Sequence, residues 1–170
     1  MSNAKQIQEA NADFVSSRTT GQLPLPPARK LAIVTCMDAR IVPYQALGIK
    51  EGDSHVIRNA GGRAPEALRS LIISQQLLAT TEIVLIQHTD CGMLTFTTEQ
   101  ARGLVSKNLN LEPSSQAHKY IQSLDFLDFP DLEKNVKEDV EFLRSNELIA
   151  NKTISGFVYD VGLGKLKKVA

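Results

Sequence analysis

Tryptophan is absent from this 170-residue sequence, and only two of its residues are cysteine. Cys36 and Cys91 allow one disulfide, but thiols in the cytosol are mostly reduced and serve more often in metal binding or catalysis, so the cysteine count alone does not decide between these uses. The 19 basic residues are balanced by 19 acidic ones, so the chain has no net charge with which to attract nucleic acid or an anionic membrane. We therefore expect no nucleic-acid partner and no membrane partner.

Long apolar runs are also absent, since no stretch approaches the roughly 20 residues that a membrane-spanning helix needs. The first residues, MSNAKQIQEANADF, lack the basic start and apolar stretch of a secretory signal. These features predict a cytoplasmic protein. A hydrophobic content of 42% suffices for a core. We expect residues 1–170 to form a single domain, with residues 1–29 as an N-terminal helix and a proline-rich arm.

Short apolar runs alternate with helical segments from residue 30 onward. The runs LAIVTC (31–36) and EIVLIQ (82–87) are apolar throughout except for Thr35, Glu82 and Gln87, as is typical of central strands covered on both faces. Strand and helix in alternation are typical of a parallel sheet wrapped by helices. The C-terminal segment TISGFVYDVGLGKLKKV (153–169) predicts a strand, a glycine-bearing turn and a second short strand.

Two segments before that end differ in their pattern. Residues 131–146 predict an amphipathic helix, whose apolar face carries Leu132, Val136, Val140 and Leu143. Residues 97–120 are polar and mixed, and the stretch LEPSSQAHKY within them predicts a loop.

Polar side chains follow both central strands at the point where each strand ends. Cys36 closes the first run, and His88 and Cys91 follow the second. Functional groups of open α/β sheets gather beyond the carboxyl ends of adjacent strands, so we expect these three side chains to meet. Two thiolates and an imidazole leave the fourth position of a tetrahedral zinc ion open, which is typical of a catalytic site. His55 and His118 are interpreted as ordinary histidines outside the site.

Other polar residues near these strand ends have two interpretations each. Asp38 and Arg40 alone would form a surface ion pair of little value, but beside the Cys and His residues they fit the charged groups of a site. The glycine pair after residue 60 is either a tight turn or a place where backbone amides approach a ligand. Asp90 either orients a ligand or caps the following helix.

Three motifs carry a family resemblance. CMDAR (36–40), HVIRNAGG (55–62) and HTDCGM (88–93) resemble the β-class carbonic anhydrases, in particular the short-chain group that also includes carbonyl sulfide and carbon disulfide hydrolases. The resemblance implies an α/β fold, in which a parallel four-stranded sheet is flanked by helices and extended by an antiparallel C-terminal strand. It also implies a Zn²⁺ cofactor and a homodimer, in some members a homotetramer.

The resemblance assigns a role to each residue that matches the motifs. Cys36, His88 and Cys91 would be the metal ligands, Asp38 and Arg40 the catalytic pair, and Gly61 and Gly62 substrate-binding residues. In a closed state of such enzymes the aspartate becomes the fourth ligand, which here would be Asp38. The tryptophan-containing bicarbonate site that regulates some bacterial members is not expected, because this chain has no tryptophan.

The implied reaction is reversible hydration of carbon dioxide to bicarbonate and a proton by zinc-bound hydroxide, which makes the protein a zinc-dependent lyase (carbonate dehydratase). The alternative is a carbonyl sulfide or carbon disulfide hydrolase that releases hydrogen sulfide from the same site. These substrates are all linear triatomic molecules, and the motifs do not separate them. Two further alternatives are a thiol redox protein, although a CxxC motif is lacking, and a non-catalytic zinc-binding module in which Asp38 is a permanent ligand.

Overall fold

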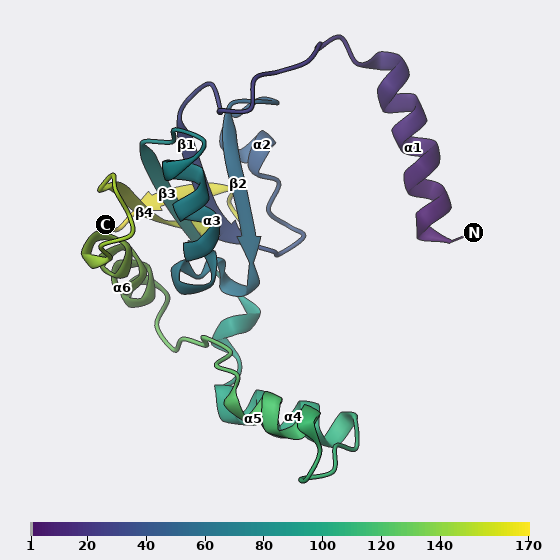
Figure 1. Ribbon diagram of the computed structural model, residues 1–170, viewed down its shortest axis with the longest axis vertical. Coiled ribbons are helices and arrows are strands. Elements are labelled where there is room, and N and C mark those ends of the chain that lie inside the picture. The colour runs from purple at the N-terminus through teal and green to yellow at the C-terminus, as the bar shows by residue number, and fades with distance from the viewer. Residues whose placement is uncertain (1) are drawn as a thin grey trace.

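A five-stranded sheet forms the centre of the computed structural model, which describes residues 2–170 (Figure 1). The strand order is β2-β1-β3-β4-β5; the first four strands are parallel, and the last is antiparallel to β4. This confirms the predicted fold class. The strands are β1 (Leu31–Cys36), β2 (Ser54–Asn59), β3 (Glu82–His88), β4 (Thr153–Asp160) and β5 (Lys165–Lys168).

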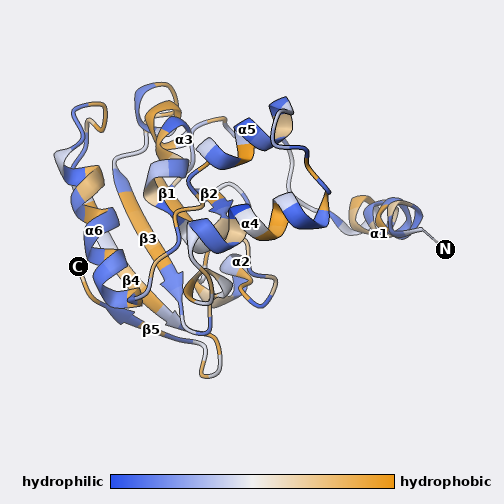
Figure 2. Ribbon diagram, turned by 90° about the horizontal axis from the view of Figure 1, so that it is seen from below, coloured by the Kyte–Doolittle hydropathy of each residue, from blue (hydrophilic) through white to orange (hydrophobic). Residues whose placement is uncertain are grey.

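Two long helices cover one face of this sheet and bury most of the core (Figures 1 and 2). They are α3 (Ala64–Gln76) and α6 (Leu132–Ser145). The predicted face of α6 is confirmed, since Val136, Val140 and Leu143 are fully buried. All six residues of β1 are buried, because the strand lies between β2 and β3 with apolar groups on both faces.

The opposite face of the sheet is covered less completely. The short helix α2 (Pro43–Ala46) lies on this side, and Leu31, Ile33, Ile49 and Ile86 form a second cluster there. Between these groups a mainly apolar groove of about 280 Å³ remains open. Its lining residues include Leu31, Ile33, Leu47, Val84, Ile86 and Phe157.

The segment predicted as a loop is largely helical. Residues 97–123 contain α4 (Thr98–Asn108) and α5 (Gln116–Ser123), so the loop prediction for 111–120 was wrong from residue 116 onward. Neither helix buries a residue; α4 has weak apolar periodicity, and α5, although it is as amphipathic as α6, has only eight residues, so the apolar pattern did not predict a helix in either segment. Their signal is capping instead: Thr97 and Gln100 form a capping box, and the Ser115 side chain accepts a hydrogen bond from the backbone N–H of His118.

The N-terminal helix α1 (Asn3–Ser17) lies away from the sheet on an extended connector (Figure 1). None of its residues is buried, and the apolar Ile7, Phe14 and Val15 are exposed by 68%, 53% and 64%. The connector is attached to the body where Arg18 and Thr20 bond to Glu51. Within residues 2–170, the longest and most apolar helices fall short of what crossing a membrane requires.

Candidate metal centre

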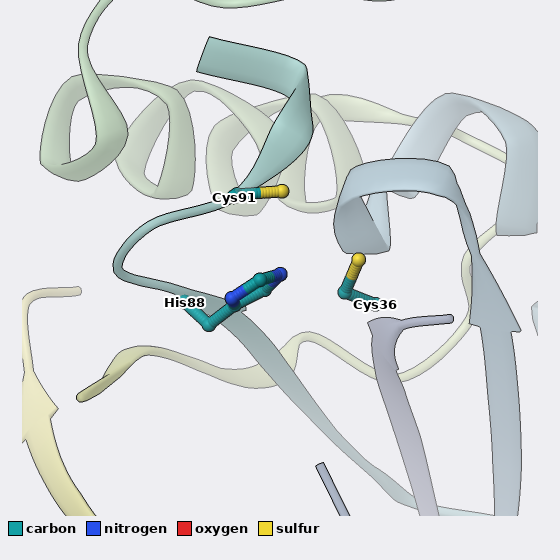
Figure 3. Close-up of side chains that lie close together, drawn as sticks. All are labelled: Cys36, His88 and Cys91. Atoms are coloured by element: carbon teal, nitrogen blue, oxygen red, sulfur yellow. The ribbon is translucent and has the colours of Figure 1, made fainter. Parts of the chain in front are cut away.

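The carboxyl ends of β1 and β3 bring Cys36, His88 and Cys91 together, as the sequence predicted. β1 and β3 are parallel neighbours, and a turn of two residues leads from His88 to Cys91. The three side chains are buried, their ligand atoms lie within 4.8 Å of one another, and they point toward a common centre (Figure 3). Buried sulfur and imidazole donors in this arrangement could hold a metal ion.

The ring of His88 is oriented as a metal ligand requires. Its Nδ1 lies 2.9 Å from the backbone carbonyl of Thr89, so Nδ1 carries the proton and donates it. Nε2 is then the basic nitrogen, and it is fully buried without a hydrogen-bond partner among residues 2–170. Because an orphaned buried nitrogen is costly, its position toward two sulfurs fits a site that is completed by a cation.

The thiols influence one another strongly in the protein alone. The neighbouring Cys91 lowers the pKa of Cys36 against the effect of burial, and His88 and the backbone N–H groups of Asp38 and Gly61 lower it further. Cys36 and burial together raise the pKa of Cys91. For His88, burial lowers the pKa, but Cys36, the Thr89 backbone and Asp38 together more than offset this, so the net shift is upward. One thiolate therefore forms readily, and a cation would be needed to stabilise the second.

Asp38 and Arg40 form a bidentate ion pair at the edge of the cluster. Arg40 donates from Nε to Asp38 Oδ1 at 3.0 Å and from Nη2 to Oδ2 at 2.8 Å. These bonds hold the pKa of Asp38 well below its usual range, against a smaller effect of burial. Asp38 Oδ2 lies 3.8 Å from His88 Nε2, so an ionised carboxylate is held beside the three donor atoms.

Asp90 also binds Arg40. Arg40 Nη1 donates to Asp90 Oδ2 at 2.6 Å, and Nη2 donates to the Asp90 carbonyl at 2.8 Å. No side-chain cap bond forms at the start of the short helix η2 (Gly92–Leu94). Of the two interpretations of Asp90, capping is therefore wrong, and the side chain helps to orient Arg40.

Gly61 and Gly62 lie in a tight turn, η1 (Ala60–Gly62), that follows β2. Both have positive φ, 78° and 65°. A Cβ at Gly62 would lie 3.0 Å from Cys36 N, Thr35 C and Ile86 O, so the turn rests directly on the backbone of β1 and β3. Asn59 closes the turn by accepting from the Arg63 backbone N–H and donating to the Arg63 carbonyl.

The close approach of Gly62 predicts a large cost for Gly62→Ala. The alanine would need a left-handed conformation and would push its methyl group into immovable backbone, so we expect a loss of about 2–3 kcal/mol in the free energy of unfolding. The matched control is Gly103→Ala in α4, where a Cβ meets nothing within 4 Å and a gain of about 0.5–1 kcal/mol is expected. Urea unfolding measures both; equal stability of the two variants would contradict the prediction.

Other polar residues, to which the resemblance assigns no role, bond to the backbone around the metal centre or lie near it. Arg58 donates to the carbonyls of Cys36 and Asp38, at 3.0 Å and 2.6 Å. Arg63, which the sequence left without a role, is buried against Asp139 of α6. A signal for Asp139 was present, because it lies three residues after Val136 and thus on the apolar face of its helix. His55 bonds to Ser74 and lies outside the metal centre.

Known proteins resemble this chain over nearly its whole length. A family model described as carbonic anhydrase matches residues 31–166. The β-carbonic anhydrase 1 of Mycobacterium tuberculosis is 42% identical over 161 residues, which cover 94% of this chain and 93% of that protein. A carbon disulfide hydrolase of Saccharolobus solfataricus is 37% identical over 161 residues, covering 85% and 79%.

Solved structures agree with these sequence matches. The carbonic anhydrase from Glaciozyma antarctica has a TM-score of 0.92 and 50% identity to this chain, with complete coverage of both chains. Its sheet and helices therefore share the architecture that positions Cys36, His88 and Cys91 here. The chain belongs to the β-carbonic anhydrase family.

Proposed function

We propose that this protein is a zinc-dependent carbonic anhydrase that reversibly hydrates carbon dioxide to bicarbonate and a proton. The observation that carries the proposal is the buried cluster of two thiols and an imidazole beside an ionised aspartate. The relatives support carbon dioxide as the substrate, since a β-carbonic anhydrase matches at 42% identity and a solved carbonic anhydrase at 50%.

Cys36, His88 and Cys91 would hold the zinc ion, because thiolate and imidazole are its usual ligands in proteins. Zinc bound there would lower the pKa of a water molecule from about 15.7 to roughly 7 and so supply a nucleophile at neutral pH. Three protein donors leave the fourth position free for this purpose. Asp38 would be excluded from it as long as Arg40 engages both carboxylate oxygens.

The remaining residues of the site position the reactants. Asp38 would accept a hydrogen bond from the nucleophile and so direct its lone pair toward the substrate carbon, while Arg40 keeps the carboxylate ionised and oriented. Gly61 and Gly62 would form the adjoining wall of the site; the space of their missing Cβ atoms is taken up by the backbone of β1 and β3 and by Met93 and Phe129, so the two glycines allow close packing of the turn beside the substrate. The Gly61 N–H already faces the Cys36 thiol, so this wall contributes shape rather than a free amide.

Hydrolysis of carbon disulfide or carbonyl sulfide is the second candidate. The 37% identical relative is a carbon disulfide hydrolase, and the same nucleophile could attack the carbon of any of the three substrates. With carbonyl sulfide, one water gives carbon dioxide and one hydrogen sulfide. With carbon disulfide, two waters give carbon dioxide and two hydrogen sulfides.

A side-by-side assay separates these candidates. The zinc-loaded protein is given carbon dioxide, carbonyl sulfide and carbon disulfide in turn, while proton and sulfide release are recorded, and Cys91→Ser serves as the control. Fast proton release from carbon dioxide with negligible sulfide is the expected result. Strong sulfide release with weak hydration would replace carbonic anhydrase by the second candidate, and inactivity toward all three would leave a non-catalytic metal site.

We further propose that two copies pair through α1, with residues 1–29 acting as an arm. The same chain has an uncovered apolar helix face and an uncovered apolar groove on its sheet, and burial of both would be favourable. Removal of residues 1–22 should therefore give a monomer by light scattering. A truncated protein that remains a monodisperse dimer would contradict this role of the arm.

A point substitution tests the arm without truncation. Phe14→Ser removes the largest apolar group of α1 and should weaken the dimer. Glu9→Ser, on the opposite side of the same helix, is the control and should leave the association unchanged.

A further inference from the structure

Arg63 and Asp139 form a buried ion pair directly behind the glycine turn. Arg63 donates from Nε to Asp139 Oδ2 at 2.9 Å and from Nη2 to Oδ1 at 3.0 Å. The two residues are only 9% and 2% exposed, and α6 contributes the carboxylate to the start of α3. Burial of an ion pair costs desolvation free energy that can exceed the attraction between the two charges. A contribution to stability therefore does not by itself explain why this pair is present.

The Asp139 carboxylate also accepts two hydrogen bonds from residues next to the metal centre, one from a backbone N–H group and one from a side chain of β3. The Ala64 backbone N–H donates to Oδ2 at 3.0 Å, and Gln87 Nε2 donates to the same oxygen at 3.1 Å. Gln87 immediately precedes His88 in β3, and Asn135 Nδ2 fixes it further by donating to Oε1 at 2.8 Å. One carboxylate therefore ties the exit of the glycine turn to the strand end that carries His88.

Arg63 extends the same connection to the other side of the turn. Its Nη1 donates to the Leu127 carbonyl, and its guanidinium lies 5.5 Å from the centre of the Phe129 ring. Phe129 in turn lies against Gly61, where an added Cβ would be 3.1 Å from its ring. Phe129 thus packs on the side of the turn that faces away from Cys36, and its position depends on its contact with Arg63.

We propose that the Arg63–Asp139 pair is a positioning device for the metal centre, which holds the Gly61–Gly62 turn against Cys36 and fixes the end of β3 at His88. The proposal rests on the proposed function for its catalytic consequence, whereas its structural part concerns this chain alone. Neither residue reaches the reacting atoms. Both act through the turn and through Gln87.

Asp139→Asn tests the device with almost no change in side-chain volume. In either orientation of the asparagine amide, its NH₂ group faces an N–H donor of Arg63. The two parallel hydrogen bonds from Arg63 can therefore no longer both form. Leu143→Ala is the matched control, because Leu143 is fully buried on the same helix and belongs to the main core cluster, not to the cluster that contains Cys36 and Phe129. Arg63→Lys keeps the positive charge but cannot form two parallel hydrogen bonds to the carboxylate. It is a second variant in case Asp139→Asn does not fold.

Amide hydrogen exchange in the metal-free proteins is the first readout, because it needs neither zinc nor activity. In Asp139→Asn, or in Arg63→Lys, the amides of residues 59–63 should exchange at least about tenfold faster than in Leu143→Ala at matched global stability. Similar exchange of this turn in the variant and the control would overturn the proposal, whether or not the protein proves to be a carbonic anhydrase.

The second readout is the cobalt-substituted protein and its turnover. Asp139→Asn should change the thiolate-to-cobalt absorption and lower kcat by about 10- to 100-fold with little change in KM, as expected when the support of metal ligands is lost. Leu143→Ala should leave the spectrum unchanged. If Asp139→Asn showed faster exchange of the turn but an unaltered cobalt spectrum and kcat, the positioning role would be overturned. Absence of turnover in the unchanged protein would count against the proposed function only.

Discussion

His88→Asn should abolish metal retention and lower hydration by about a thousandfold or more, because the acidity that the ion gives to water is lost. The asparagine amide can still donate to the Thr89 carbonyl, as Nδ1 does at 2.9 Å. It offers nothing at the position of Nε2, which is the buried nitrogen directed at the sulfurs. The substitution therefore removes the ligand while it preserves the bond that orients the side chain.

The control for this variant is His118→Asn. His118 lies in α5, far from the cluster in sequence, and is not one of the three grouped donors. Metal content after dialysis against a chelator, followed by readdition of zinc and the hydration assay, distinguishes the two. A His88→Asn protein that retained stoichiometric zinc and most of its activity would exclude His88 as a ligand.

Arg40→Met should lower kcat/KM at neutral pH by about 10- to 100-fold, as loss of a group that orients a catalytic partner does. Asp38 loses two side-chain hydrogen bonds, and its pKa rises toward the usual value, because Arg40 is the main cause of its depression. The released carboxylate would then be free to occupy the fourth position of the proposed zinc ion. We expect the acid limb of the activity profile to move to higher pH.

The sign of the effect on stability follows from the same shift. A carboxyl whose pKa is lowered in the folded state stabilises the fold above its unfolded pKa, and this contribution is lost as the pH falls through the folded value. The difference in unfolding free energy between the unchanged protein and Arg40→Met should thus be present at neutral pH and shrink in acid. Arg69→Met, at an exposed position of α3, is the control and should show no such pH dependence. A pH–activity profile unchanged by Arg40→Met would contradict the role given to the ion pair.

The sheet could be predicted because its strands have a simple local signature. Residues 31–34 and 83–86 are apolar without interruption, and such short runs are typical of strands covered on both faces. Helix α6 was equally clear from its apolar spacing. Helix α4 was missed because it is largely polar and buries nothing, and α5 because its apolar periodicity extends over only eight residues after a loop that contains Pro113.

The three candidate ligands could also be predicted from the sequence, because adjacent parallel strands end at one edge of a sheet and the chain has only two cysteines. Residue types and spacing were sufficient for that inference. The tertiary structure decided that Asp90 is a second partner of Arg40, which nitrogen of His88 carries the proton, and that the glycine turn packs on the backbone of β1 and β3. It also joined Arg63 to Asp139, 76 residues apart in the chain. Contacts of this kind depend on how helices dock onto a sheet, and local sequence patterns carry no record of that docking.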